Sequence, residues 1–281
     1  MRVKGRKLGA VTRLHAPESH LVGHIVQSNV TLFDRLFSTE VDGQPFVQEV
    51  QALIPMNPRF PSHCDCGETR KALVQAIQNY WWSNRVSILS SNRDDPFGNL
   101  PNYGMHQLDR KGCDWGLMIA AEASGCWTSE LATEISYAAD DGASIIGLGL
   151  PELEELTKVG IVSNRCAVWN IGRLIEAGGF FPISSPLIAP HVASVFTGCY
   201  DNKEYTYAPV GGEEGVTSIL MAQLGARVAV ITPRHDIPVE EPSSPNKLRQ
   251  FQAMMATKAK RTWAAIEAVK LSSGVLTNAL I

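Results

Sequence analysis

Apolar residues along this chain recur with two periods, one typical of strands and one typical of helices. Short apolar runs bounded by turn residues predict buried strands at 85–89, 143–150 and 227–233. Apolar positions three and four residues apart predict a helix at 68–82. Because strand and helix signals alternate, the pattern predicts an α/β or α+β fold.

The first sixty residues predict mainly β structure. Asp42-Gly43 stands between two extended segments, which is a strong signal for a two-residue β-hairpin. The apolar residues of 47–54 do not alternate cleanly, so this second arm is open to both strand and helix. We therefore expect an N-terminal region that contains a β-hairpin, followed by a layered domain of helices and strands.

A polar stretch divides the chain. Residues 91–112 are rich in Asn, Asp, Pro and Gly, which predicts a long loop or a domain boundary. The predicted organisation is an arm with a hairpin and helix at 1–90, this loop, and an α/β region at 113–281. Whether the first and last parts share one core stays open at this point.

Several helices are expected in the C-terminal half. The pattern favours helices at 114–124, 128–142, 151–160 and 164–179, with Asn164 as a possible N-cap of the last. A long basic C-terminal helix is predicted to begin at the Ser244 N-cap. Its cations include Lys258, Lys260 and Arg261.

The composition adds little about function but narrows the setting. Charged residues make up 19% of the 281 positions, compared with about 25% in typical soluble domains. This low value favours a surface partly covered by partners, or one rich in neutral polar residues. No apolar run approaches the ~18–20 residues of a membrane span, so we expect no membrane partner. Six cysteines without an apolar leader predict reduced thiols, in the cytoplasm or in an assembled particle.

The two ends of the chain are basic. The first thirteen residues contain five cations and no acid, at Arg2, Lys4, Arg6, Lys7 and Arg13. Together with the cations of the C-terminal helix, these residues are candidates for contacts with nucleic acid or with sister subunits. A solvated basic tail is the alternative.

Two histidine and cysteine groups are weak candidates for a metal site. His20 and His24 are four residues apart, but β-branched neighbours favour a strand, in which residues four apart lie about 13 Å from each other. His63, Cys64 and Cys66 crowd together without a second cysteine pair to complete a zinc site. We therefore expect no metal and no cofactor.

A glycine-rich turn is the most suggestive motif for ligand binding. Gly211, Gly212 and Gly215 precede a predicted helix that begins near Thr217, which is an arrangement that can hold a phosphate at a helix N-terminus. The spacing is not that of a dinucleotide fingerprint, and the adjacent acids Glu213 and Glu214 would repel an anion. Strand, turn, helix and strand without a ligand is the competing interpretation.

His235 and Asp236 follow the predicted strand at 227–233. Catalytic groups of α/β enzymes often stand on loops that follow strands. No serine or cysteine partner is visible for a catalytic role.

Two functions remain in competition. The main hypothesis is a self-assembling homo-oligomeric subunit, for example a viral or virus-like shell protein, which buries apolar surface between copies and uses its basic ends. The alternative is an α/β enzyme or a small-ligand or phosphate-binding protein, with its site at the turn 211–215 and with His235 and Asp236 as catalytic candidates.

Overall fold

The computed structural model describes the sheet, its helices and short stretches of the C-terminal third. The described residues are 6–14, 19–55, 66–91, 99–149, 161–162, 165–180, 217–218, 221–222, 224–232, 245, 248–249, 252 and 263. All structural statements below concern these residues.

One seven-stranded sheet forms the centre of the molecule, with the order β5-β4-β1-β6-β8-β7-β9. Its strands are β1 (Leu8–Arg13), β4 (Val47–Pro55), β5 (Val86–Ser91), β6 (Trp115–Ile119), β7 (Ala143–Leu148), β8 (Cys166–Asn170) and β9 (Arg227–Ile231). All run parallel except β8, which is antiparallel to both neighbours. The predicted α/β fold class is confirmed.

The parallel strands begin along one border of the sheet and end along the opposite border. We call the edge where the parallel strands end the carboxyl edge, and the edge where they begin the amino edge. Because β8 is antiparallel, it begins at the carboxyl edge, where Cys166 pairs with Ile119.

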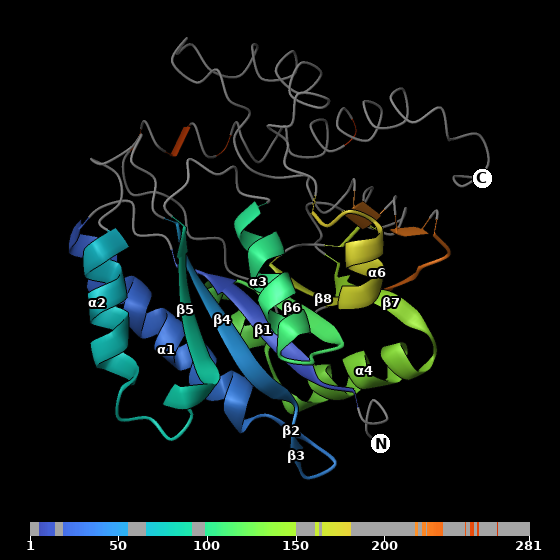
Figure 1. The fold of residues 1–281 in the computed structure, drawn as a ribbon, viewed down its shortest axis with the longest axis horizontal. Coiled ribbons are helices and arrows are strands. Elements are labelled where there is room, and N and C mark those ends of the chain that lie inside the picture. The colour runs from blue at the N-terminus through green and yellow to red at the C-terminus, as the bar shows by residue number, and fades with distance from the viewer. Residues whose placement is uncertain are drawn as a thin grey trace.

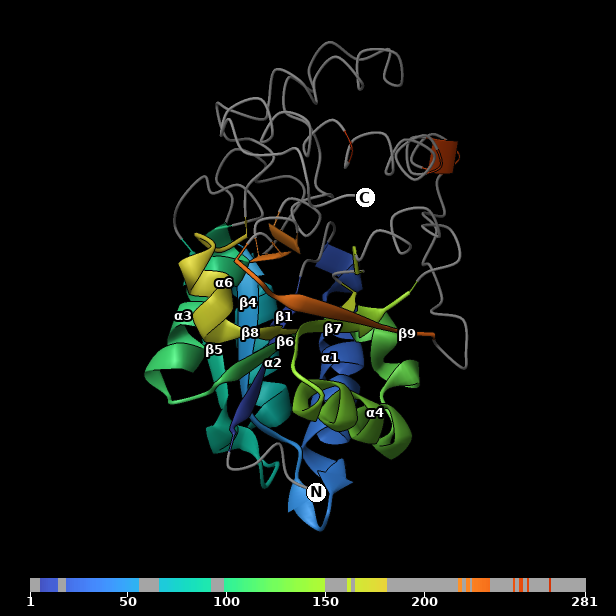
Figure 2. The same ribbon diagram turned by 90° about the vertical axis from the view of Figure 1, so that its right-hand side faces the viewer.

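Helices cover both faces of the sheet. They are α1 (Val22–Ser38), α2 (Cys66–Ile77), α3 (Asn99–Arg110), α4 (Ser129–Asp140) and α6 (Ile171–Glu176), with the short 3₁₀ helices η1 (Ser19–Leu21), η2 (Ser83–Arg85) and η3 (Ala121–Cys126). Figures 1 and 2 show α1 and α4 on one side of the sheet and α3 and α6 on the other.

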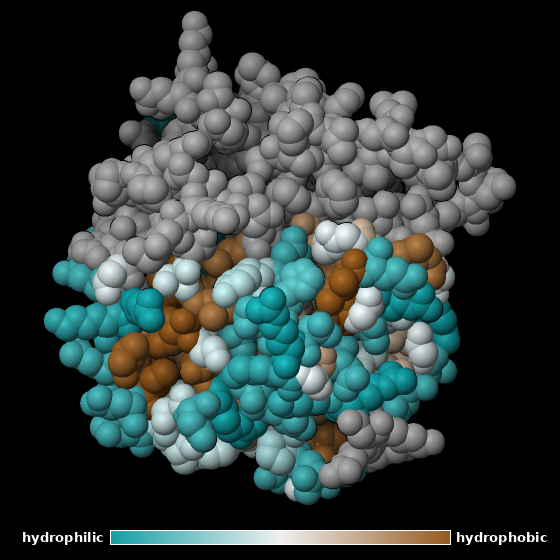
Figure 3. Space-filling model, in the orientation of Figure 1, coloured by the Kyte–Doolittle hydropathy of each residue, from teal (hydrophilic) through white to brown (hydrophobic). Residues whose placement is uncertain are grey.

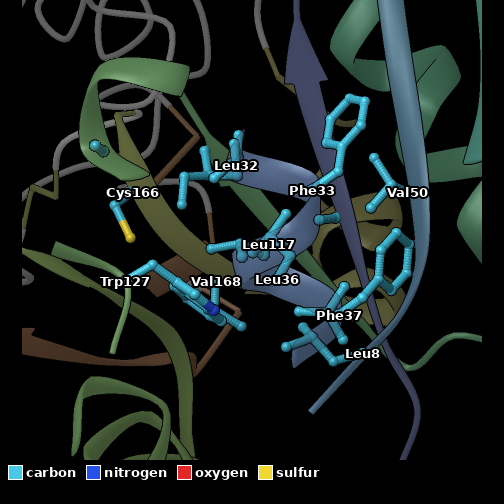
Figure 4. Close-up of a cluster of buried hydrophobic side chains, with 14 of the residues drawn as sticks. Leu8, Leu32, Phe33, Leu36, Phe37, Val50, Leu117, Trp127, Cys166 and Val168 are labelled. Atoms are coloured by element: carbon cyan, nitrogen blue, oxygen red, sulfur yellow. The ribbon is translucent and has the colours of Figure 1, made fainter. Parts of the chain in front are cut away.

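Each face has its own buried apolar cluster. Figure 4 shows the larger cluster, in which Phe33 and Phe37 of α1 meet Val50, Leu117 and Val168 of three strands. The second cluster lies under α3 and α6 and contains the fully buried Trp169. Burying such large side chains contributes on the order of 1.5–3 kcal/mol each, so both faces stabilise the fold.

Small residues let α3 lie close to the sheet. A Cβ atom added to Gly9 of β1 would lie 2.3 Å from Leu108 of α3, and one added to Gly104 of α3 would lie 3.0 Å from Val11. Such distances leave no room for a side chain at Gly9 unless Leu108 moves. The close approach holds α3 firmly over β1, and so fixes where α3 begins at the carboxyl edge.

The predicted hairpin is confirmed. Strands β2 (Glu40–Val41) and β3 (Gln44–Pro45) pair in the antiparallel sense around the predicted turn. Asp42 and Gly43 have φ angles of 54° and 70°, the left-handed values that a two-residue type I′ turn requires.

Other local predictions are confirmed in part. The helix expected at 68–82 corresponds to α2, and the strands expected at 85–89, 143–150 and 227–233 correspond to β5, β7 and β9. The helix expected at 128–142 is α4, which begins after Thr128, whose Oγ1 accepts a hydrogen bond from Leu131 N at 3.2 Å.

The expectation of mainly β structure in the first sixty residues is wrong. Residues 22–38 form α1, in which Val22, Val26, Val30, Phe33 and Phe37 are buried along one side. Their spacing of three and four residues outweighs the strand preference of β-branched side chains, because burial against the sheet stabilises the helix. Residues 47–55 form a strand rather than a helix.

Two predicted helices begin as strands. Residues 115–119 are β6 instead of helix, and 166–170 are β8. The N-cap of the following helix α6 is therefore Asn170, not Asn164, and its Oδ1 accepts a hydrogen bond from Arg173 N at 3.0 Å. Both strands are fully buried apolar runs, in which periodicity does not separate strand from helix.

The predicted loop at 91–112 contains α3, whose residues pack on β4 and β1. Strands from both sides of this stretch belong to the same sheet. The predicted helix at 151–160 lies outside the described residues. Within the predicted long C-terminal helix, isolated positions such as Leu248 and Trp263 are described as helical. Its basic residues Lys258, Lys260 and Arg261 lie outside the described residues, so the structure does not support that helix.

None of the described helices combines the length and the apolar character needed to cross a lipid bilayer.

Strand β5 ends the sheet on the side of α2, and Figure 3 shows an apolar area on this side of the molecule. Exposed apolar side chains in this region include Val74 and Trp81, which are 46% and 64% exposed. The expected self-association stays a prediction.

Candidate functional site

The order of the strands predicts a ligand crevice at the carboxyl edge, between the ends of β1 and β6. The chain passes from β1 outward to β4 and β5, and then returns to form β6 on the other side of β1. The connections after β1 and β6 therefore diverge at this point. In open α/β sheets, ligands bind outside the carboxyl ends of the strands at such a reversal of order.

Two arginines flank the end of β6 in this crevice. Val11 of β1 pairs with Met118 of β6, and Arg13 and Ala120 each follow this pair by two residues. On the other side, Ala120 N donates a hydrogen bond to Arg165 O at 2.9 Å. If the strands continued with ideal spacing, Arg13 and Arg165 would lie about two strand spacings apart, roughly 10 Å.

Only one residue of this row is placed on a face of the sheet by its strand. Residues two apart on an extended chain point to the same side. Val11, Met118 and Ala167 belong to the buried cluster under α3 and α6. Arg13, two residues after Val11 in β1, therefore faces this side, whereas Ala120 follows β6 and Arg165 precedes β8.

One carboxylate stands beside this row. Glu122 follows Ala120 by two residues, in the first turn of η3, and is exposed. The described part of the crevice thus combines two groups that bind phosphate oxygens well with one that can accept a proton or contact a cation. Among the described residues, no three His, Cys, Asp or Glu side chains form a metal cluster.

The end of β1 is fixed by buried polar groups on the opposite face. Thr12 and Asn29 are each 1% exposed, and Thr12 Oγ1 donates a hydrogen bond to Asn29 Oδ1 at 3.3 Å. Asn29 in turn donates to Ile25 O at 2.9 Å, within α1. Since buried polar groups are costly to leave without partners, this chain of hydrogen bonds fixes the strand end that carries Arg13.

A second set of neutral hydrogen bonds ties two connections together beside the crevice. Asn102, near the start of α3, donates to Phe180 O at 2.9 Å and accepts from Phe180 N at 2.7 Å. The chain reaches Phe180 through Gly179, which has a φ of 82° and would place a Cβ only 2.6 Å from Asn102. Only glycine meets both conditions, because the left-handed backbone and the close contact each disfavour a side chain.

Thr217, a predicted ligand-binding residue, belongs to this same assembly. It is fully buried, and its Oγ1 donates a hydrogen bond to Gly179 O at 3.3 Å. Its hydroxyl therefore contacts the protein in the described structure. Gly211, Gly212 and Gly215, together with His235 and Asp236, lie outside the described residues. The site predicted on them stays a prediction.

The basic N-terminal segment is divided between the two edges of the sheet. Arg6 and Lys7 stand at the amino edge, where Lys7 Nζ donates to Lys111 O at 3.0 Å and lies 3.6 Å from Glu49 Oε1. Arg13 ends β1 at the carboxyl edge, about 20 Å away along the strand. Residues 8–13 thus form a central strand rather than part of an arm. Arg2 and Lys4 lie outside the described residues, and contacts with nucleic acid or subunits stay a prediction.

The metal candidates are only partly described. His20 lies in η1 and His24 in α1, so the predicted strand around them is wrong. Both are exposed. Cys66 begins α2, and His63 and Cys64 lie outside the described residues.

The described cysteines are free thiols. Cys113, Cys126 and Cys166 are buried. Burial, with a smaller contribution from the nearby Cys126, raises the pKa of Cys166 to about 12. Burial also raises the pKa of Cys113 to about 11, against the lowering effect of Lys7. Both groups stay protonated at neutral pH, so neither provides a nucleophilic thiolate.

No protein-family model matches the chain. No curated protein matches it either. Matches are found among solved structures, and those described below are 12–13% identical to this chain.

One match is a mannosyltransferase from Pyrobaculum calidifontis in complex with GDP-Man and Mn²⁺, with 12% identity, a TM-score of 0.48, and coverage of 98% of this chain and 78% of that one. A 4-diphosphocytidyl-2C-methyl-D-erythritol synthase matches at 13% identity and a TM-score of 0.46, covering 89% of this chain and 100% of that one. Glucosyl-3-phosphoglycerate synthase from Mycobacterium tuberculosis, in complex with UDP, matches at 13% identity and a TM-score of 0.40, covering 92% and 81%.

The main functional hypothesis, a self-assembling shell subunit, is therefore corrected. The matching structures named above are transferases and synthases, not shell proteins. The open, mostly parallel sheet agrees with this correction, because its order reverses at the carboxyl edge, where α/β proteins bind small ligands. The segment expected to be an arm is instead built into the sheet centre.

Proposed function

We propose that this chain is an enzyme that binds a phosphate-containing small molecule at the carboxyl edge, between the ends of β1 and β6. The row Arg13–Ala120–Arg165 carries this proposal. It combines a cation at the end of β1 with a second cation whose backbone is hydrogen-bonded to the residue after β6, where the strand order reverses. Guanidinium groups bind phosphate oxygens through paired, charge-assisted hydrogen bonds.

The reaction we propose is group transfer from a nucleotide-activated donor. In this reaction, a hydroxyl group of an acceptor would form a bond to the transferred group as the bond between that group and the diphosphate breaks. Arg13 and Arg165 would hold the diphosphate and stabilise the negative charge that develops on it. Glu122, which is exposed, would accept the proton of this hydroxyl group or contact a cation that accompanies the diphosphate. The solved structures supply the first ligands to test, GDP-Man and UDP, rather than the reason for the proposal.

The predicted motifs that lie outside the described residues agree with this proposal, because the strand that precedes His235 and Asp236 ends at the carboxyl edge. Strand β9 is parallel to β7, so it too ends at the carboxyl edge, and His235 follows its last residue Ile231 by four positions. Thr217, two residues after Gly215, is tied to the assembly beside the crevice. We therefore keep His235 and Asp236 as proposed catalytic residues and Gly211–Gly215 as a proposed ligand-binding turn.

The proposal is tested by calorimetric titration of the full chain with UDP and with GDP-Man, each with and without Mn²⁺. We expect saturable binding, and a loss of about tenfold in affinity in Arg13→Gln and in Arg165→Gln, because a hydrogen bond to a charged group contributes about 1.5–3 kcal/mol. Arg110→Gln is the matched control, since Arg110 is exposed at the other end of α3. The absence of binding, or equal losses in all three variants, would overturn the proposal.

A further inference from the structure

A cavity opens at the amino edge of the sheet, whereas the proposed site lies at the carboxyl edge. It has a volume of about 410 Å³ and lies between the start of β1, the hairpin β2–β3, and α4. In Figure 1 the hairpin β2–β3 lies below the sheet. Its size is within the range of roughly 300–1,000 Å³ that is typical of small-molecule sites.

The walls of this cavity combine an aromatic side and a basic side. Phe46 of the chain after the hairpin and Trp115 of β6 provide aromatic rings, and Ile135 and Ala139 of α4 provide aliphatic surface. Arg6 and Lys7 also line the cavity, and no acidic side chain lines it among the described residues. An occupant with an apolar body and a negative charge matches both sides.

The two basic residues differ in how far their charges are compensated by neighbouring groups of the protein. Lys7 Nζ is bonded to Lys111 O and lies near Glu49, so part of its charge is compensated within the fold. Arg6 is exposed and makes no ion pair with any residue that the structure describes. The uncompensated charge at the mouth of the cavity is therefore mainly that of Arg6.

Trp115 is a largely buried residue in the wall of the cavity. It is 3% exposed, and its indole Nε1 has no hydrogen-bond partner within the described part of the chain. A buried N–H without a partner is uncommon, because its desolvation is not offset.

We propose that this cavity is a second binding site, specific for a small amphipathic anion with a flat apolar body and a carboxylate or a similar acidic group. The apolar body would lie against Phe46 and Trp115, and the anion would lie near Arg6. The site is separate from the proposed transferase site, since it stands at the opposite edge of the sheet and shares no described residue with it.

The probes are 2-naphthoate and its neutral isostere 2-naphthamide, titrated into the full chain by calorimetry. We expect one saturable site for 2-naphthoate and about threefold weaker binding of 2-naphthamide, because an exposed ion pair contributes about 0.2–1 kcal/mol. In Arg6→Gln, this preference for the anion is expected to disappear. Arg13→Gln, at the other edge, is expected to retain it.

A second measurement locates the ligand. In a ¹⁵N–¹H spectrum, the indole N–H signal of Trp115, assigned through Trp115→Phe, is expected to shift on addition of 2-naphthoate. Ala139→Leu, which adds volume to the wall of the cavity, is expected to prevent this shift, and circular dichroism verifies that the variant is folded. Nucleotide binding in Arg6→Gln is expected to equal that of the wild type, which separates this proposal from the one for the carboxyl edge.

Three results would overturn the proposal. They are no saturable binding of 2-naphthoate, an unchanged Trp115 signal at saturation, or an anion preference that persists in Arg6→Gln.

Discussion

The two edges of the same sheet use their charged residues differently. At the amino edge, Glu49 forms ion pairs with two lysines: Lys111 Nζ lies 2.7 Å from its Oε2, and Lys7 Nζ lies 3.6 Å from its Oε1. Arg227 and Asp141 form a further pair there, at 3.0 Å. These ion pairs connect the beginnings of strands to neighbouring turns, so their role is to hold the fold together.

At the carboxyl edge, neutral groups hold the connections in place. Asn102 binds both backbone atoms of Phe180, and Thr217 binds Gly179 O. The charged residues Arg13 and Arg165 stand instead at strand ends, on either side of Ala120. The comparison shows that the ion pairs of the amino edge serve the structure, whereas the arginines of the carboxyl edge are proposed to serve a ligand.

The largest effect on stability is expected at Asn102. Replacing it with Ala removes both hydrogen bonds to Phe180 and leaves two backbone groups without these partners, which costs about 2 kcal/mol in the free energy of unfolding. Urea denaturation measures this change. The exposed His106 on the same helix is the matched site, and His106→Ala is expected to change the stability by less than about 0.5 kcal/mol.

If the 178–180 turn supports the ligand site, Asn102→Ala is also expected to weaken UDP binding at a temperature where the variant remains folded. A destabilised variant with wild-type affinity would separate this turn from the proposed site.

A smaller effect concerns Cys166, which lies at the carboxyl edge. Burial raises its pKa from 9.0 to about 12, so the unfolded chain loses this proton near pH 9 whereas the folded chain keeps it. The stability due to this thiol is therefore fully present below pH 9 and is lost as the pH rises toward 12.

Cys166→Ala is expected to reduce the fall in stability by about 1.4 kcal/mol per pH unit over this range. Denaturation of both proteins at pH 8, 9 and 10 measures the difference. Parallel curves for variant and wild type would contradict the assignment. For Cys113, near the amino edge, the corresponding window is shorter, since its pKa is about 11.

The smallest effect is expected at Glu49. Glu49→Gln removes the shared partner of Lys7 and Lys111, whose side chains are 28% and 36% exposed, so solvent screening limits the loss to about 1 kcal/mol. The loss is expected to shrink in 1 M NaCl, and UDP affinity is expected to stay unchanged. A clear fall in UDP affinity would show that the two edges are not separate in function.

The sequence alone predicts the elements that have strong local signals. Asp42-Gly43 marks the hairpin, and Thr128 marks the start of α4. It does not predict β6 or α1 correctly, because a short buried apolar run has no period and because burial of Phe33 and Phe37 outweighs local strand preference.

The candidate site is harder to predict because its residues are distant in sequence. In the sequence, Arg13 is one of five cations among the first thirteen residues, and no motif surrounds Arg165, so neither residue stands out. Only the strand order brings them to either side of Ala120. Both arginines stand beside an apolar segment, which is a signal that the sequence contains. Because the patterns of 114–124 and 164–179 predict helices, the sequence does not show that β6 ends and β8 begins at the same edge.

The most direct test is a titration of the full chain with inorganic pyrophosphate, because this probe contains only the group that the two arginines are proposed to hold. Wild-type protein and Arg110→Gln are expected to bind it equally, and Arg13→Gln/Arg165→Gln is expected to bind it about 100-fold more weakly, two hydrogen-bonded charges being lost. Equal affinity in all three proteins would contradict the assignment of the carboxyl edge as the phosphate site.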